Sequence, residues 1–244
     1  MSKKTIIIKA SDYNYPSREE LREVYKINPD LHSFGYISDH PMKSLVLMEK
    51  SIIEVHRDDH LHYWDGVLLN RNGTLSRTYY NAMVYYLRGF PDDESTFEHR
   101  HYINRIQFDK YAETFYYHFS TVKDTIAQIL NVYYSMGFNV GNMYFKNVLS
   151  RIPDKTVLKA ITDFNVLTEV TTEYRNSFTH RTPINYPDSR STIDRSGNSL
   201  IYGSATHSFV KSSVIKNNMV STFIALAELL DTLKILMPQK IEVI

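Results

Sequence analysis

The feature that most constrains the fold is the segment 102–136, in which apolar residues recur with the period of an α-helix. The apolar stripe consists of Phe115, Phe119, Val122, Ile126, Ile129 and Tyr133. Polar residues, among them Asp124, lie on the opposite side, and Gly137 is suited to end the helix in a left-handed conformation. Because a helix this long buries its stripe mainly against other helices, we expect it to be the spine of an α-helical bundle.

Similar spacing predicts helices before the spine. One pattern begins after Pro41 and carries apolar residues as far as Val55, and Asn72-Gly73 is expected to break this segment. Its apolar positions are Leu45, Leu47, Met48, Ile52, Ile53 and Val55. A second pattern covers residues 75–90, so two helices are expected in this part of the chain.

After the spine, one continuous stripe predicts a helix that ends close to Thr182, because Pro183 disfavours the α conformation in the residue before it. This stripe consists of Phe164, Leu167, Val170, Tyr174 and Phe178. A last helix is expected over residues 209–237. Its inward side chains should be Val220, Phe223, Ile224, Ala227, Leu230 and Leu233.

The predicted fold class is therefore all-α: a helical bundle with a long spine helix, a small N-terminal appendage and a long irregular loop before the last helix. The appendage is expected to cover residues 1–35, and the helical domain residues 36–244. The loop, about residues 182–208, is rich in Ser, Asn and Arg, and residues 199–202 are expected to pair briefly as a strand.

Two local signals fall inside the appendage. Residues 5–8 form a short apolar run that is typical of a strand. Ser17 and Glu20 have the spacing of a capping box, which predicts that a helix begins after Ser17.

Composition excludes several classes of site. The chain has 244 residues and no cysteine, which excludes disulfides, thiolate zinc sites, iron–sulfur clusters and cysteine nucleophiles. The formal net charge is +1, so any contact with nucleic acid must come from a local basic patch. The start has no signal-peptide core, and charged residues interrupt the apolar segment 219–237. We therefore expect a cytoplasmic protein without a membrane partner.

The chain also lacks a glycine-rich phosphate loop, a dinucleotide fingerprint and a nucleophile elbow. Chemistry must then depend on His, Arg and carboxylate side chains, and the best candidate segment is 173–181. Its His180 falls in the last turn of the predicted helix, where the helix dipole favours imidazolium. Arg175 precedes it by five residues, about 140° around a regular helix, so one helix does not bring the two groups together. A histidine and an arginine at a helix end also commonly act as simple caps.

The order Arg175, Asn176, His180, late on a helix of an all-α bundle, resembles the signature of the HEPN superfamily (higher eukaryotes and prokaryotes nucleotide-binding). That signature is an Arg, usually followed by Asn, Asp or His, with a His four to six residues after the Arg. Residues 122–128 on the spine also resemble the first main helix of bacterial members. The resemblance covers the helical body from about residue 41 to the end.

The resemblance implies a metal-independent endoribonuclease without a cofactor, or an RNA-binding effector. It implies a homodimer in which Arg175 and His180 motifs meet across a two-fold axis to form one composite site. The RNA 2′-OH would attack the adjacent phosphodiester, with His180 as general acid or base, Arg175 stabilising charge on phosphorus and Asn176 orienting His180 or the phosphate. The resemblance further implies a toxin or phage-defence role, with an antitoxin or regulatory protein as a second partner.

Several neighbouring residues are candidate supporting groups. Asp124 is a candidate acceptor for Arg175 or His180, although solvent exposure on the polar face of its helix is an equal alternative. Glu173 and Thr179 flank the motif. Basic residues that could hold RNA phosphates are Arg181, Arg190, Arg195 and Lys211, and Tyr186 and Tyr202 could stack on bases.

A histidine cluster offers a different chemistry. His56 and His60 are four residues apart and share one helical face, with His62 close by, which is a spacing that can bind a metal. The catalytic zinc motif requires Glu after the first His, whereas Arg57 stands there, so a solvated polar face is the favoured interpretation.

Two alternative functions come from other classes. The first is a non-catalytic helical module that binds a protein partner through its tyrosine-rich surface, since the chain has Tyr 19 against Trp 1. The second is a nucleotide-binding regulator.

Overall fold

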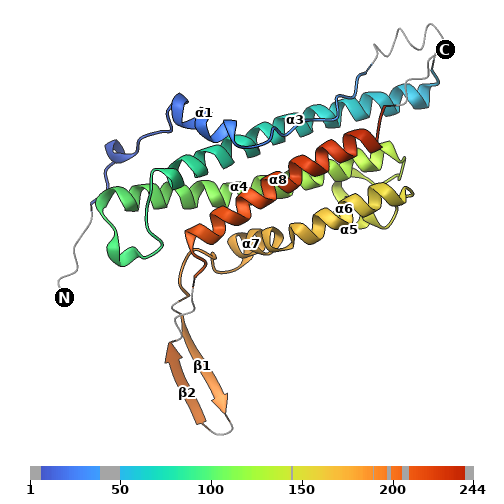
Figure 1. Cartoon of the computed structure of the whole chain (residues 1–244). Helices are drawn as coiled ribbons and strands as arrows, with labels where there is room; N and C mark the ends of the chain where they lie inside the picture. Colours follow the sequence, from blue (N-terminus) through green and yellow to red (C-terminus); the bar gives the residue numbers. More distant parts are fainter. Residues whose placement is uncertain are drawn as a thin grey trace.

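The computed structural model describes residues 7–38, 50–143, 145–188, 190–196, 199–204 and 209–239. The helices are α1 (Arg18–Lys26), α3 (Ile52–Leu87), α4 (His99–Tyr133), α5 (Phe145–Leu149), α6 (Lys155–Leu167), α7 (Glu169–His180) and α8 (Ser212–Leu236). Three short 3-10 turns cover Ala10–Asp12, Glu94–Thr96 and Val140–Asn142. The predicted all-α bundle is confirmed (Figure 1).

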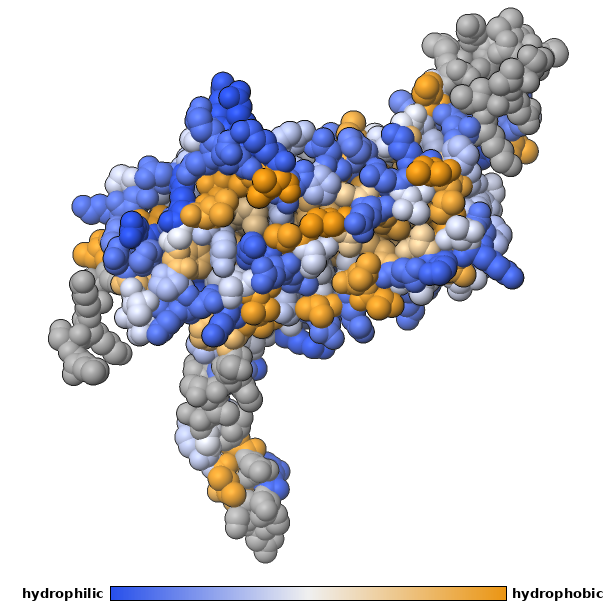
Figure 2. Space-filling view, viewed as in Figure 1, coloured by the Kyte–Doolittle hydropathy of each residue, from blue (hydrophilic) through white to orange (hydrophobic). Residues whose placement is uncertain are grey.

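The face of the molecule in Figure 2 is mainly hydrophilic, and its hydrophobic side chains form separate patches. In the described parts of the chain, no helix combines the length and the apolar character that a membrane span requires.

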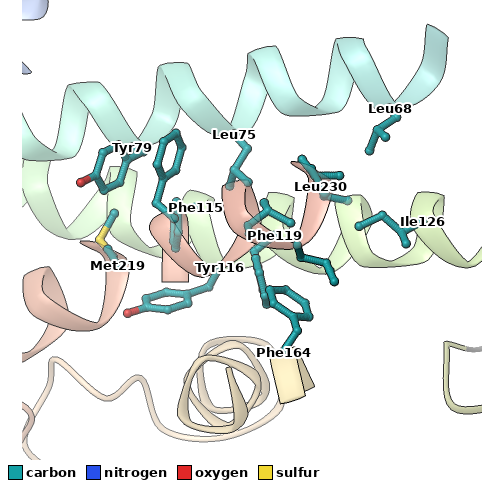
Figure 3. Close-up of a cluster of buried hydrophobic side chains, with 14 of the residues drawn as sticks. Leu68, Leu75, Tyr79, Phe115, Tyr116, Phe119, Ile126, Phe164, Met219 and Leu230 are labelled. Carbon is teal, nitrogen blue, oxygen red and sulfur yellow. The ribbon is translucent and has the colours of Figure 1, made fainter. Parts of the chain in front are cut away.

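The predicted spine is α4, and it packs along α3 on one side and against α8 and α7 on the other (Figure 1). The core lies between these helices (Figure 3). The labelled side chains there are Leu68, Leu75 and Tyr79 of α3, Phe115, Tyr116, Phe119 and Ile126 of α4, Phe164 of α6, and Met219 and Leu230 of α8. Tyr79 stacks on Phe223 with ring centroids 4.3 Å apart, so aromatic contacts join the first helices to the last.

The predicted break at Asn72-Gly73 is wrong, because α3 continues through both residues to Leu87. Leu68 and Leu75 on either side are fully buried, and the Asn72 amide donates to the His32 carbonyl at 3.0 Å. Packing on both sides of the dipeptide outweighs its local preference for a turn. The helix starts at a capping box on Ser51, and residues 41–49 of the predicted pattern lie outside the described residues.

The predicted continuous helix over residues 164–178 is also wrong. The helix is interrupted at Thr168, which lies between α6 and α7. The N–H and the hydroxyl of Thr168 both donate to the Phe164 carbonyl. The buried positions Phe164, Thr168, Thr171 and Phe178 keep helical spacing through the interruption, and Leu167 and Val170 lie beside them and are exposed. The predicted end of this segment near Thr182 is confirmed, because α7 ends at His180.

Two smaller expectations also differ. The spine ends at Tyr133, and Ser135 is the first left-handed residue after it (φ 51°), so Gly137 (φ 75°) lies beyond the helix end. On α8, Ile224 is exposed, whereas the neighbouring Phe223 is buried in the core.

The segment before α8 is less irregular than expected. The predicted strand at residues 199–202 is confirmed, and it belongs to β2 (Ser199–Ser204), which pairs antiparallel with β1 (Ser191–Ser196). The two strands form a hairpin that projects away from the helices (Figure 1).

The N-terminal segment is attached to α3 by one buried carboxylate. Asp65 is 5% exposed and accepts hydrogen bonds from the N–H groups of Phe34 (2.7 Å), Gly35 (2.8 Å) and Tyr36 (3.1 Å), and from the Ser33 hydroxyl (3.2 Å). Val24, Phe34 and Tyr36 are buried in the same core as the helices. The predicted capping box of Ser17 and Glu20 is confirmed at the start of α1. Ile7 and Ile8 are in no strand, and residues 5 and 6 lie outside the described residues.

Replacing Asp65 by Ala should remove the acceptor for three backbone N–H groups. We expect a loss of about 2 kcal/mol or more in the free energy of unfolding, because buried donors are left without partners. Urea unfolding measures the loss, and amide hydrogen exchange should accelerate at Phe34, Gly35 and Tyr36. Asp231→Ala on the exposed face of α8 is the control, and equal effects of the two substitutions would contradict this role.

A second attachment is sensitive to pH. The Arg88 guanidinium donates to both carboxylate oxygens of Glu20 at 2.8 Å, which lowers the pKa of Glu20 from 4.5 to about 2. Stability from this pair is therefore present above pH 4.5 and is lost as the pH falls towards 2. Because the Glu20 side chain is 36% exposed, solvent screening limits the contribution to about 1 kcal/mol.

Glu20→Gln should accordingly lower the free energy of unfolding at pH 7 by about 1 kcal/mol. The difference from the parent should shrink progressively below pH 4.5, and urea unfolding over a pH series measures it. Glu23→Gln on the same helix is the control. A difference that stays constant from pH 7 down to pH 3 would contradict the assignment.

Candidate functional site

Helix α7 is held on the core by aromatic and hydroxyl contacts. The buried Phe178 stacks on Tyr116 of α4 at 5.6 Å, and Tyr174 meets the same ring edge-on at 5.7 Å. Within the interface with α8, the Thr171 and Thr222 hydroxyls lie 2.6 Å apart. These contacts fix the rotation of α7 about its axis, so Arg175, Asn176 and His180 lie away from the fully buried side.

Arg175 has hydrogen-bonding capacity that its own chain does not use. Its Nη1 donates to the Asn176 side-chain oxygen at 3.2 Å, which places the guanidinium beside the amide. Its Nε is buried and has no hydrogen-bond partner in the part of the chain that the structure describes. A buried donor without a partner is uncommon and costly, which marks Arg175 as an unusual position in the helix.

His180 is exposed at the last residue of α7, and it faces an open pocket of about 810 Å³. The pocket is lined by Ser177, His180, Arg181, Thr182, Pro183, Pro187, Asp188 and Arg190. Arg190 binds Asp188 through two hydrogen bonds of 2.6 and 2.8 Å, so its charge is matched within the pocket wall. Arg181 is exposed beside the imidazole, without an ion pair to any described residue, and can meet an anion there.

The segment between the pocket residues Pro183 and Pro187 is anchored by a buried arginine that the sequence did not single out. Arg105 of α4 is 5% exposed, binds Asp109 at 2.7 Å, and donates to the Asn185 carbonyl at 3.3 Å. Next to it, the Val210 N–H donates to the Ile184 carbonyl at 2.7 Å. The chain therefore leaves and re-enters the bundle at one anchored position.

The structure does not bring Arg175 and His180 together within one chain. No hydrogen bond joins these two described residues, in agreement with their separation of about 140° around α7. Thr179 donates its hydroxyl to the Arg175 carbonyl at 2.8 Å, which is a contact within the helix, and Glu173 is exposed. The two motif groups thus face different surroundings.

Asp124 lies on the side of α4 that faces Arg175. Its pKa is raised by partial burial, and the positive charges of Arg71, Arg175 and Lys123 oppose this rise. Asp124 is nevertheless exposed to solvent, and it makes no hydrogen bond to Arg175. Asp124 and Arg175 therefore interact through their charges.

Two nearby groups were missed in the sequence. Arg71 of α3 donates to the Thr121 carbonyl of α4 at 2.7 Å and contributes to the charge around Asp124. Tyr117 donates to Glu113 at 2.7 Å, and this hydrogen bond raises the pKa of Tyr117, while the charge of Arg175 opposes the rise. Arg71 directly precedes Asn72-Gly73, so the expected helix break concealed that it faces α4.

The other predicted positions are spread over the surface. Arg195 is exposed on β1, Lys211 is exposed immediately before α8 and lies close enough to Asp93 to help lower the pKa of that carboxyl, and Tyr186 and Tyr202 are exposed. The rings of His56 and His60 are 4.1 Å apart on α3, and His62 Nδ1 donates to the Tyr36 carbonyl at 2.8 Å. Among the residues with described positions, no group of three or more possible ligands could hold a metal ion.

The charge coupling at Asp124 can be tested directly. Arg175→Ala should raise the pKa of Asp124, because it removes one of the positive charges that oppose the rise. Side-chain carboxyl NMR titration measures this pKa. Arg175→Lys, which keeps the charge, should give a smaller change, and an unchanged pKa in both variants would show that Arg175 and Asp124 are not neighbours.

Comparison with known proteins agrees with the helical body described above. The family model of the HEPN_Cthe2314-like HEPN family matches residues 64–239, from the middle of α3 to the end of α8. No curated protein and no solved structure matches the chain. At the level of the superfamily, this match associates the chain with nucleotide-binding or RNase-like function. The matched region covers more than half of the 244 residues and contains Arg175, Asn176 and His180, and the chain therefore belongs to the HEPN_Cthe2314-like HEPN family.

Proposed function

We propose that the protein is a metal-independent endoribonuclease whose active site is formed by Arg175, Asn176 and His180. The observation that carries the proposal is the position of His180, exposed in an open pocket of about 810 Å³ at the end of α7. A histidine that only capped the helix would need no such space beside it. The family membership supports the same reading, because the chain has the Arg-polar-His pattern of the superfamily.

The reaction would be an internal transesterification. The ribose 2′-oxygen attacks the adjacent phosphorus, the bond from phosphorus to the 5′-oxygen breaks, and a 2′,3′-cyclic phosphate and a 5′-hydroxyl result. One imidazole takes the 2′-OH proton or gives a proton to the leaving 5′-oxygen. The Arg175 guanidinium stabilises the additional negative charge on the phosphoryl oxygens.

The separation of Arg175 and His180 on α7 favours a composite site. In a homodimer, His180 of one protomer can act beside Arg175 of the other, which removes the need for contact within one helix. Asn176 accepts a hydrogen bond from Arg175 and so positions the guanidinium. Asp124, Glu173 and Thr179 would act as positioning groups.

Binding of RNA would rest first on the residues nearest the imidazole. Arg181 is exposed in the pocket and can bind a phosphate, whereas Arg190 reaches a phosphate only beside Asp188. Arg195 and Lys211 would contact more distant phosphates. The role in the cell would be that of an RNA-directed effector in toxin–antitoxin or phage-defence systems, restrained by an antitoxin or regulatory protein.

His180→Ala and Arg175→Ala should each lower the rate of RNA cleavage by about 10²-fold or more, because acid–base and charge stabilisation are lost. The measurement follows fluorescent RNAs of mixed sequence in excess chelator and identifies the cyclic phosphate product. Arg18→Ala, on the distant helix α1, is the matched control. Cleavage by His180→Ala at the parent rate would contradict the proposal.

Mixing the two inactive variants tests the composite site. A mixed dimer of His180→Ala with Arg175→Ala keeps one complete pair of Arg175 and His180 across the two-fold axis. After subunit exchange, we expect recovery of about a quarter of the parent activity, since half of the dimers are mixed and half of their sites are complete. Absence of recovery would place both groups of a working site in one chain.

A further inference from the structure

The hairpin β1–β2 exposes one strongly apolar face. Ile193 pairs with Tyr202 and Arg195 pairs with Leu200, so these four residues share a face of the two-stranded sheet. Ile193 is 65% exposed, Leu200 71% and Tyr202 75%. Ile201 lies on the opposite face, one residue out of phase.

The described strands of this hairpin pack mainly against each other. It projects away from the helices, on the side of the bundle formed by α6 and α7 (Figure 1), and its hydrophobic residues lie at the surface (Figure 2). An isolated two-stranded hairpin is marginally stable in water, and it gains stability by covering one apolar face. The sequence places three large apolar side chains on a face that the described residues leave largely exposed.

A second exposed apolar patch lies on the bundle where α6 meets α7. It consists of Val166 (69% exposed), Leu167 (68%) and Val170 (45%), which lie beside the buried positions Phe164, Thr168 and Thr171. We call these three residues the α6–α7 patch. Glu169 and Glu173 flank it and are exposed, so its rim is acidic. The apolar hairpin face carries Arg195, and the two surfaces are therefore complementary in both hydrophobicity and charge.

The dimensions of the two surfaces also agree. A six-residue strand rises about 17 Å from its base. The eleven residues from Val170 to His180 span about 15 Å of α7. The base of the hairpin adjoins the pocket of His180, because Asp188 and Arg190 line that pocket. In a dimer whose two α7 helices meet at their His180 ends, the hairpin of one protomer is therefore long enough to reach the α6–α7 patch of its partner.

We propose that the hairpin is an arm that packs through Ile193, Leu200 and Tyr202 against the α6–α7 patch of a second copy of this chain. The inference rests on the proposed function, in which two α7 helices meet at their His180 ends. Each protomer gives one arm and receives one, so the contact is reciprocal and closes a two-fold dimer. The arms would hold the two motifs in register and border the space where RNA enters.

The test uses the full-length chain and sedimentation equilibrium. The parent should be a dimer, and Leu200→Asp should weaken its dissociation constant about tenfold or more, because a charge replaces a buried anchor. Leu167→Asp on the patch should have a similar effect. Ile201→Asp, on the neighbouring residue of the opposite hairpin face, is the matched control and should leave the dissociation constant unchanged. Circular dichroism confirms that the helices of each variant remain folded.

Crosslinking identifies the two surfaces, since the natural chain has no cysteine. Leu200→Cys and Leu167→Cys chains, mixed and treated with a short bismaleimide, should give a covalent dimer that contains one chain of each kind. Three outcomes would contradict the proposed arm. They are crosslinking only between two Leu200→Cys chains, a parent that stays monomeric, and equal effects of Leu200→Asp and Ile201→Asp.

The outcomes separate the arm from the proposed chemistry. A parent dimer that depends on Leu200 but does not cleave RNA supports the arm and contradicts the ribonuclease. A ribonuclease whose dimer tolerates Leu200→Asp, while its affinity for single-stranded RNA falls, overturns the arm and makes the hairpin an RNA contact.

Discussion

The hydroxyl of Tyr116 requires a hydrogen-bond partner inside the core, and the placement of α7 depends on how this requirement is met. Tyr116 is fully buried on α4, and burial raises its pKa well above 10, so it remains a neutral donor. It donates to Asn218 of α8 at 2.9 Å, and the same amide oxygen accepts from Thr171 of α7 at 3.3 Å. One amide therefore joins α4, α7 and α8, and the Tyr116 ring supports Phe178. The direction in which Arg175 and His180 leave the bundle follows from this junction.

The fold class could be predicted because long periodic segments carry a strong signal. The stripe on α4 and most inward positions of α8 are buried as expected, since a helix of this length must bury its apolar side. The errors occurred where local preference and tertiary packing disagree. Asn72-Gly73 resembles a turn when read alone, but Leu68 and Leu75 hold the helix straight through it. At Thr168 the opposite occurred, because a continuous apolar pattern concealed a residue that leaves helical geometry (φ −107°, ψ 17°) and whose hydroxyl bonds back to the Phe164 carbonyl.

The candidate site was predictable in its motif but not in its surroundings. Arg175, Asn176 and His180 could be found because their spacing is a property of the sequence. Arg71, Tyr117 and Arg105 could not, because they reach the site from other helices whose relative rotation no local pattern records. The same reason explains why the ion pair of Arg190 with Asp188 was not predicted.

The hydrogen bond from Val210 to Ile184 has a consequence for modularity. The chain leaves the bundle at Ile184 and returns at Val210, whose N–H lies 2.7 Å from the Ile184 carbonyl oxygen. The residues between them therefore form an insertion whose two ends are joined by this hydrogen bond. The order and packing of the helices do not depend on the length of this insertion. Its length can therefore change during evolution or engineering without altering the helix packing, while the junction that carries α7 into α8 stays intact. The helical bundle is thus a constant scaffold, and the insertion is the part of the chain that can diversify.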